Sequence, residues 1–240
     1  SPYSPLFRIL RKFMKANKIR PQISATGGQA VEAGSVWIDG EFFSGNPDFK
    51  KILAENYNKL STEEQHFLDV TCDELLRMFD VHKVSETRVM PRDVLDFMKN
   101  KGFFALLIPK EFGGLDFSTL AISSIMAKVG TVSGVVSTFV IITNTLGAAE
   151  LIIHYGTKEQ KEHYLPKLAR GEYITCFGLT EPTAGSDAAS IKAEGMVFKD
   201  NDGEIKIKLN FRKRYITLAP VANLISLACS LKDPANLLGK

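Results

Sequence analysis

The sequence has few of the residues that build disulfide frameworks and metal sites. Its 240 residues include three cysteines, Cys72, Cys176 and Cys229, which lie far apart and form no CxxC pair. The four histidines show no HExxH motif or other metal-binding spacing. We therefore predict no disulfide framework, no bound metal and a reducing, cytoplasmic location.

Net charge is also small. The formal charge of +3 is too low to indicate a nucleic-acid partner, and no run of Lys and Arg is interleaved with aromatic residues. We predict no nucleic-acid binding. With 45% hydrophobic and 24% charged residues, the composition is that of a globular protein with one large domain or two smaller ones.

The positive charge is concentrated at the start of the chain. Residues 1–20 contain six Lys or Arg and no Asp or Glu. Leu6, Leu10, Phe13 and Met14 fall at helical spacing there, which is typical of a helix on an anionic membrane surface. A peripheral contact with the inner membrane is one interpretation, and a solvated basic helix packed on its own domain is the other. No apolar run after the cations is long enough for a signal peptide.

Long hydrophobic runs are scarce. Residues 129–150 carry no charge before Glu150, and this length would suffice to cross a membrane. However, seven Ser, Thr and Asn residues make the segment too polar for hydrocarbon. We predict a buried helix.

Start signals for helices are plentiful between residues 46 and 172. Ser61 with Glu64 and Thr157 with Gln160 form capping boxes, and Ser118 can cap a third helix. We predict a helical domain over 46–172, preceded by a basic extension over 1–45.

The pattern changes to strands from Tyr173 onward. YITCFGLT at 173–180 is strand-like, and a run around 196–198 leads through Asn-Asp-Gly into the alternating EIKIKL, which predicts a hairpin. RYITLA at 214–219 and NLISLACSL at 223–231 predict two more strands. The fold class is therefore α+β, an all-α helical domain followed by a partial antiparallel β domain over 173–240.

Small and hydroxyl residues follow the first of these strands, in CFGLTEPTAGSD at 176–187. Thr180 stands where the strand ends, Pro182 prevents further pairing, and Gly185 with Ser186 lets a ligand approach the backbone closely. RYITLAP would supply a second wall, and together they predict a cleft for a flat ring with a phosphate. The alternative is a plain strand-terminating turn in which Ser186 or Asp187 caps a helix.

Three segments in the family's order resemble the flavin-dependent acyl-CoA dehydrogenases. They are LTEPTAGSD at 179–187, GFFALLIPKEFGGLDFS at 102–118 and HYGTKEQKEHYLPKLARGE at 154–172. EAGSVWIDGEFFSGNPDFKK at 32–51 and KRYITLAP at 213–220 are similar to the long bacterial fatty acyl-CoA dehydrogenases. Tyr215 stands where smaller members usually carry Trp.

The resemblance implies a helical N-terminal domain, a β domain that holds FAD, and a C-terminal helical bundle beyond residue 240. The residues that it places against the flavin are Phe177, Leu179, Thr180, Gly185, Ser186, Tyr215, Ile216 and Thr217. It places Asn144 and Leu146 in the acyl channel, although plain core packing is the competing interpretation for both.

The activity implied by the resemblance is α,β-dehydrogenation of a medium- or long-chain fatty acyl-CoA to the trans-2-enoyl-CoA in β-oxidation, with hydride transfer to flavin N5. The family's glutamate base lies in the C-terminal bundle, and we assign no catalytic residue in this chain, Glu181 included. We expect the segment alone to hold flavin weakly and to be inactive. Electron-transfer flavoprotein is the implied acceptor, and a homodimer is the implied state of the full-length protein.

Three alternatives stay open at this point. A relative on the same scaffold could be an oxidase or monooxygenase that delivers electrons to oxygen. A membrane-surface helical module with a purely structural β segment belongs to a different class. A helical scaffold for a protein partner is the third alternative, although no distinct sequence feature favours it.

Overall fold

The computed structural model describes residues 4–16, 38, 41–42, 45–145 and 147–239. It divides into two compact units. One comprises Ser1–Tyr57 with Ser186–Ser190, and the other comprises Asn58–Gly185 with Ile191–Lys240.

The first unit carries short helices in its described residues. Helix α1 spans Ser4–Ala16 and confirms that the basic start of the chain is helical. Helix α4 spans Phe49–Ala54, and its N-cap Asp48 accepts a hydrogen bond from the amide of Lys50 at 3.0 Å. Most of the predicted extension over 1–45 lies outside the described residues.

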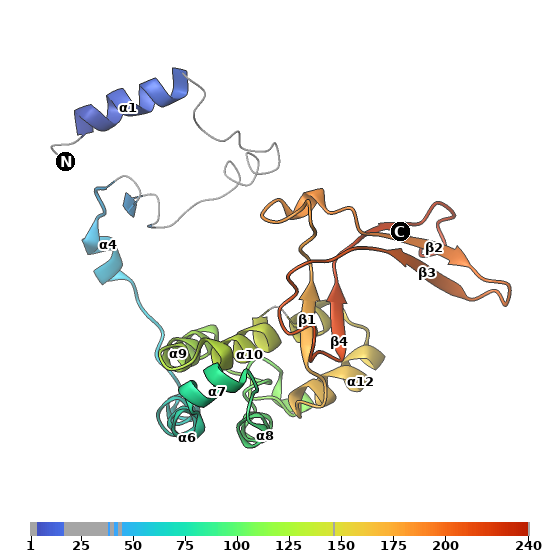
Figure 1. Cartoon of the computed structure of the whole chain (residues 1–240), viewed down its shortest axis with the longest axis horizontal. Helices are drawn as coiled ribbons and strands as arrows, with labels where there is room; N and C mark the ends of the chain where they lie inside the picture. The colour runs from blue at the N-terminus through green and yellow to red at the C-terminus, as the bar shows by residue number, and fades with distance from the viewer. Residues whose placement is uncertain (1–3, 17–37, 39–40, 43–44, 146, 240) are drawn as a thin grey trace. The chain divides into compact units, whose positions relative to one another are not determined.

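The second unit begins with a helical layer (Figure 1). Its elements are α5 Thr62–His66, the π-helical turn η1 Phe67–Thr71, α6 Cys72–Met78, α7 Val81–Thr87, α8 Arg92–Asn100, the 3₁₀ turn η2 Lys110–Phe112, α9 Thr119–Gly130, α10 Gly134–Thr145, α11 Ala148–Tyr155 and α12 Lys158–Ala169.

The predicted helix starts are confirmed. Ser61 and Glu64 form a complete capping box at the start of α5, and Thr157 with Gln160 forms another at the start of α12. The Ser118 hydroxyl accepts a hydrogen bond from the amide of Ala121 at 3.2 Å and caps α9. Each cap satisfies an amide that the helix itself leaves unpaired.

The prediction of a buried helix over 129–150 is confirmed from Gly134 onward, but not for residues 129–133. Helix α9 ends at Gly130, a turn follows, and the rest of the segment belongs to α10 and the start of α11. Ser133 breaks the helix because its hydroxyl accepts from the amide of Val136 and caps α10. Within the described residues, Gly134–Tyr155 is long and apolar enough to span a membrane, but 53% of its most apolar window is buried inside the protein, as in core helices of soluble proteins.

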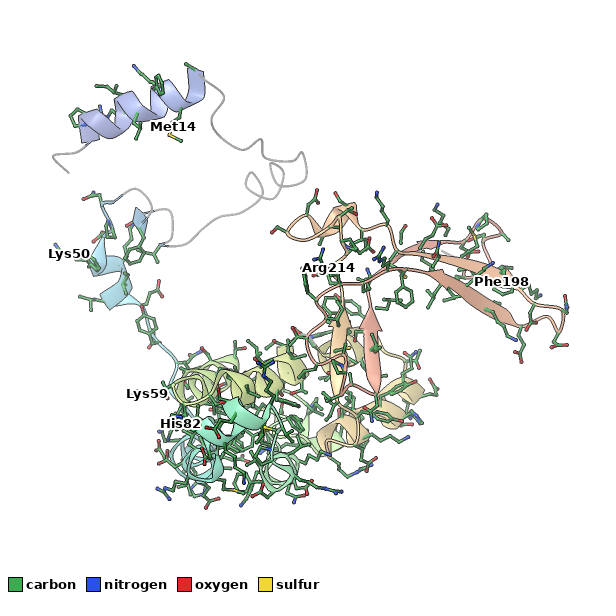
Figure 2. All side chains as sticks on the ribbon, in the orientation of Figure 1. Met14, Lys50, Lys59, His82, Phe198 and Arg214 are labelled. Carbon is green, nitrogen blue, oxygen red and sulfur yellow. The ribbon has the colours of Figure 1, made fainter. Side chains whose placement is uncertain are left out.

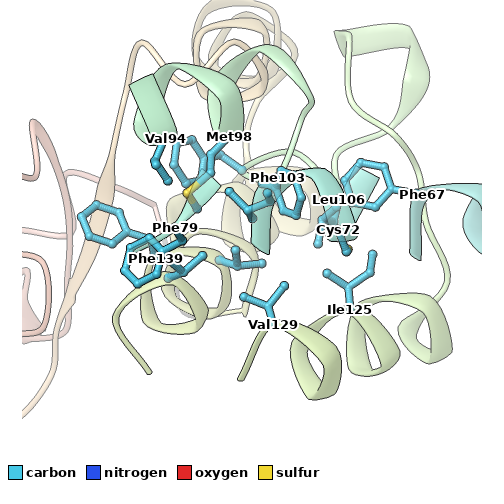
Figure 3. Close-up of a cluster of buried hydrophobic side chains, with 14 of the residues drawn as sticks. Phe67, Cys72, Phe79, Val94, Met98, Phe103, Leu106, Ile125, Val129 and Phe139 are labelled. Atoms are coloured by element: carbon cyan, nitrogen blue, oxygen red, sulfur yellow. The ribbon is translucent and has the colours of Figure 1, made fainter. Parts of the chain in front are cut away.

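The main core lies among α6, α8, α9, α10 and the chain that follows α8 (Figure 3). Phe67 packs edge-on against Phe117, with ring centroids 5.3 Å apart, and also contacts Phe103. Met98, Ile125 and the other members shown in Figure 3 are buried. This core anchors the elements that border the strands.

The strands form two small sheets. β1 (Thr175–Gly178) pairs in parallel with β4 (Leu224–Leu227), beside α10 and α11. β2 (Glu194–Lys199) pairs antiparallel with β3 (Ile205–Asn210) as the predicted hairpin, and in parallel with β5 (Ser230–Lys232). The α+β fold class is confirmed, but the antiparallel expectation holds only for the hairpin. A tight turn permits antiparallel pairing, whereas the long connections to β4 and β5 bring the chain back in parallel.

Candidate functional site

The chain reverses direction just after β1. The Glu181 amide donates to the Ala184 carbonyl at 2.9 Å, and the Ala184 amide donates back to Glu181 at 3.3 Å. Pro182 and Thr183 therefore occupy the tip of a tight turn and are exposed. The strand β1 (Thr175–Gly178) ends two residues before Thr180, so Thr180 lies between the strand and this turn.

A buried ion pair anchors this turn. Lys213 Nζ lies 2.9 Å from Glu181 Oε1, and both side chains are about 5% exposed or less. Glu181 also accepts hydrogen bonds from the amides of Lys192 and Ala193 at 2.7 and 2.9 Å. The Lys192 amide, followed by Lys213, lowers the pKa of the Glu181 carboxyl to about 2. Sequence reasoning missed Lys213, because its partner lies 32 residues away.

The second predicted wall lies against the first. The Arg214 amide donates to the Thr180 carbonyl at 2.9 Å, and Lys213 Nζ donates to the Leu179 carbonyl at 3.0 Å. These bonds bring the segment that begins at Lys213 to the end of β1. The two predicted cofactor-contacting segments are thus adjacent through their backbones.

The prediction of a strand over RYITLA is wrong. Tyr215 and Leu218 have φ angles of 57° and 64°, in the left-handed region that a strand cannot contain. Leu218 packs against the helical core, and its carbonyl accepts from the amides of Val221 and Ala222, so the segment turns. Thr217 consequently lies on a turn and not at a strand end.

Tyr215 presents an aromatic ring at the surface. It is 76% exposed, and the guanidinium of Arg214 lies 4.2 Å from the ring centroid. Figure 2 labels Arg214. Arg214 also donates a hydrogen bond to the Tyr215 hydroxyl. Left-handed backbone is uncommon for a bulky residue and costs free energy, so it is found where the surrounding structure or a function requires it.

The polar side chains predicted to meet a ligand are available for one. The hydroxyls of Thr180 and Thr217 make no hydrogen bond among the described residues. A Cβ built on Gly185 would meet no atom within 4 Å, so open space borders the backbone there. Phe177, Leu179 and Ile216 are half-buried.

Ser186 belongs to the other compact unit and is exposed. Next to it, the backbone carbonyl of Asp187 accepts a hydrogen bond from the Ser190 amide at 3.1 Å, and the Asp187 carboxylate accepts one from the Ser190 hydroxyl at 2.7 Å. These bonds close the 3₁₀ turn η3 (Ala188–Ser190). The Asp187 carboxylate thus bonds a hydroxyl and not a helix amide, so its capping role stays a prediction, as does the ligand role of Ser186.

Asn144 is fully engaged with the protein backbone. Its Oδ1 accepts from the Leu106 amide at 2.8 Å, and its Nδ2 donates to the carbonyls of Phe103 and Val140 at 2.7 and 2.8 Å. The side chain is 2% exposed and ties α10 to the chain after α8. Core packing accounts for these contacts, and its substrate role stays a prediction. Leu146 lies outside the described residues.

An apolar cavity that sequence reasoning missed lies between α7, the start of α10 and residues 218–221. It has a volume of about 760 Å³. Phe79, Val84, Phe139, Leu218 and Val221 line it, with Arg88 at its margin. No local motif marks it, because its walls come from three distant parts of the sequence.

Metal-binding clusters are not found in the described part of the chain, where no group of three His, Cys, Asp or Glu could hold an ion. The thiol of Cys72 is buried, which raises its pKa to about 12. It is therefore not a reactive nucleophile.

Two family profiles match the chain in succession. "Acyl-CoA dehydrogenase, N-terminal domain" matches residues 62–172, and "Acyl-CoA dehydrogenase, middle domain" matches residues 176–238. Together they cover the helical layer and the strands of the second unit.

Curated relatives include a 3-(aryl)acrylate reductase of Clostridium sporogenes, 38% identical over 60% of this chain and 36% of the relative. The caffeyl-CoA reductase-Etf complex subunit CarC of Acetobacterium woodii is 36% identical over 59% of this chain and 36% of its own. The very long-chain specific acyl-CoA dehydrogenase of mouse mitochondria is 34% identical over 57% and 21%. The chain thus spans about a third or less of the length of these relatives.

Solved structures show the same fold. An acyl-CoA dehydrogenase from Geobacillus kaustophilus superposes with a TM-score of 0.62 at 28% identity, over 72% of this chain and 44% of that one.

Proposed function

Since the chain belongs to the acyl-CoA dehydrogenase family, we propose that it forms part of a FAD-dependent oxidoreductase that acts on the CH–CH bond of an acyl-CoA. The observation that carries the proposal is the hydrogen bond from the Arg214 amide to the Thr180 carbonyl. It joins the two segments predicted to contact the flavin. The reaction that we propose is α,β-dehydrogenation of a medium- or long-chain fatty acyl-CoA, as in β-oxidation.

The residues present fit a flavin. Thr180 and Thr217 carry hydroxyls that no described residue engages, the space beside Gly185 is open, and Tyr215 offers an exposed ring. We propose that the backbone and side chains around Phe177 to Thr180 bind the pyrimidine side of the ring. Gly185 and Ser186 would then face the pyrophosphate. When bound, FAD supplies the two-electron acceptor that the side chains of a protein lack.

Proton abstraction from a thioester α carbon requires a carboxylate whose pKa lies near the working pH. Glu181 is unsuited to this role, because its pKa of about 2 and its three donors keep it ionised and occupied. The carboxylate instead holds the turn that carries Thr180. We assign no catalytic base among the described residues.

The second candidate function is the reverse reaction. The relatives from Clostridium sporogenes and Acetobacterium woodii are reductases by name, whereas the mouse relative is a dehydrogenase. Reduction of an enoyl-CoA on the same site is therefore the runner-up. The name of the Acetobacterium relative includes Etf, which supports our proposal that electron-transfer flavoprotein is the electron partner. A cytoplasmic location and a homodimer are further parts of the proposal.

The decisive experiment is anaerobic titration of the native flavoprotein with saturated acyl-CoAs of graded chain length. Bleaching of the visible flavin band, with transfer of electrons to electron-transfer flavoprotein, is the expected result. If saturated acyl-CoAs leave the spectrum unchanged while an enoyl-CoA reoxidises the pre-reduced flavin, the reductase function replaces it. Peroxide formation without the electron-transfer partner would instead indicate an oxidase, and absence of flavin would refute the proposal.

A further inference from the structure

Helix α1 has two chemically distinct faces. At about 100° per residue, its cationic positions fall within an arc of about 100° on one side of the axis, four of its apolar positions fall on the opposite side, and Phe7 and Met14 fall between the two. The cationic positions are Arg8, Arg11, Lys12 and Lys15, and the opposite ones are Leu6, Ile9, Leu10 and Phe13.

Apolar side chains of this face are exposed, Ile9 and Leu10 among them. Ile9 is 66% exposed, Leu10 is 49% exposed and Phe13 is 59% exposed, while Arg8 and Lys12 are exposed on the other side. A helix of 13 residues is marginal in water without packing against another surface. The exposed apolar side chains are therefore a surface suited to a partner.

The charges identify the kind of partner. Residues 1–20 contain six cations and no acidic residue, so they repel a basic partner and attract a negatively charged surface. A lipid bilayer with anionic headgroups provides both an apolar layer and negative charge along one plane. We propose that α1 binds an anionic membrane surface, with its axis in the plane of the headgroups and Ile9, Leu10 and Phe13 buried in the acyl boundary.

No residue assigned to the flavin site belongs to α1. The buried clusters of the second unit contain no residue of α1. Substitutions in α1 should therefore leave those clusters intact. Membrane binding and flavin chemistry can accordingly fail separately, and each can be tested without the other.

The test is co-sedimentation of the 240-residue chain with vesicles of phosphatidylcholine alone or mixed with phosphatidylglycerol. Binding to the mixed vesicles only, weakened by salt, is expected. Changing Arg8→Gln with Lys12→Gln should lower partitioning roughly 30-fold, because each cation near the surface contributes a factor of about five. Changing Ile9→Ser with Leu10→Ser should weaken binding by at least about tenfold through the lost apolar contact.

The matched control is Lys59→Gln with Lys83→Gln, which removes the same charge from exposed positions outside α1. Its binding should equal that of the unchanged chain. If the control loses binding as strongly as the α1 variant, the net charge is responsible and the proposal is overturned. Equal binding to neutral vesicles, no binding at all, or salt-independent dimerisation of α1 without vesicles would each overturn it as well.

Discussion

Glu64 joins the starts of two helices that are far apart in the sequence. Its Oε2 accepts from the Ser61 amide at 2.8 Å, which completes the capping box of α5, and its Oε1 accepts from the Ser118 amide at 2.7 Å, at the N-cap of α9. Burial of this carboxyl raises its pKa, but the amides of Ser61 and Ser118, together with the side chains of the same two serines, outweigh burial and lower the pKa to about 2. A single carboxylate therefore fixes α5 against α9.

We predict that Glu64→Gln lowers the free energy of unfolding substantially at neutral pH. A pKa that falls from 4.5 to about 2 corresponds to roughly 3 kcal/mol of stabilisation of the ionised form. Solvent near the start of α5 screens part of this, so we expect a loss of about 2 kcal/mol. Because the folded-state pKa is depressed, the stabilisation is present above the unfolded pKa and is lost as the pH falls from about 4.5 towards about 2.

Urea denaturation of Glu64→Gln and the unchanged chain, at about pH 7 and about pH 3, measures this difference. The difference in free energy of unfolding between Glu64→Gln and the unchanged chain should be smaller at the lower pH. Glu63→Gln is the control, since Glu63 is 57% exposed and only pairs with Lys110 at 2.6 Å, and exposed pairs contribute little. A gap that is the same at both pH values, or a control that loses as much stability, would refute the electrostatic reasoning.

Further predictions concern the site and its support. Asn144→Ala should lower the free energy of unfolding, measured by urea denaturation, by about 3 kcal/mol, because it leaves a buried amide and buried carbonyls without hydrogen-bond partners. Lys213→Met should destabilise the chain more than Lys213→Met combined with Glu181→Gln, since only the single variant leaves a buried charge unpaired; equal losses would contradict this. Tyr215→Asn should change stability by less than about 0.5 kcal/mol and weaken FAD binding by the native protein. The backbone of Leu218 is also left-handed, but its side chain packs on the helical core, so Leu218→Asn should lower the melting temperature. If Tyr215→Asn lowered the melting temperature more than Leu218→Asn, our assignment of Tyr215 to the flavin site would be contradicted.

Helix starts were predictable because their causes are local. Ser61, Ser118 and Thr157 each cap an amide no more than three residues away, so both partners can be read from one short stretch of sequence. The hairpin of β2 and β3 was predictable for the same reason, since its turn residues and alternating strands are contiguous. The α+β class followed from these elements.

Predictions from the sequence failed where contacts with distant residues override the local preference for a secondary structure. RYITLA has the β-branched and aromatic residues of a strand, but the Arg214 amide bonds to Thr180 and Leu218 packs on the helices. These contacts force a turn that no local pattern indicates. The pairing of Glu181 with Lys213 and the contacts of Asn144 with the chain after α8 are non-local in the same way.

The conformation of Tyr215 links the helical layer to the candidate flavin site. Upstream, the segment is held to the end of β1 through the amide of Arg214, and downstream it is held to the helical core through Leu218. Only two residues separate Tyr215 from Leu218, so both anchors act on a short stretch that contains two left-handed residues. The free-energy cost of these conformations is met by contacts on either side. The helical layer therefore helps to shape the segment predicted to contact the flavin, although none of its own residues is predicted to touch the ring.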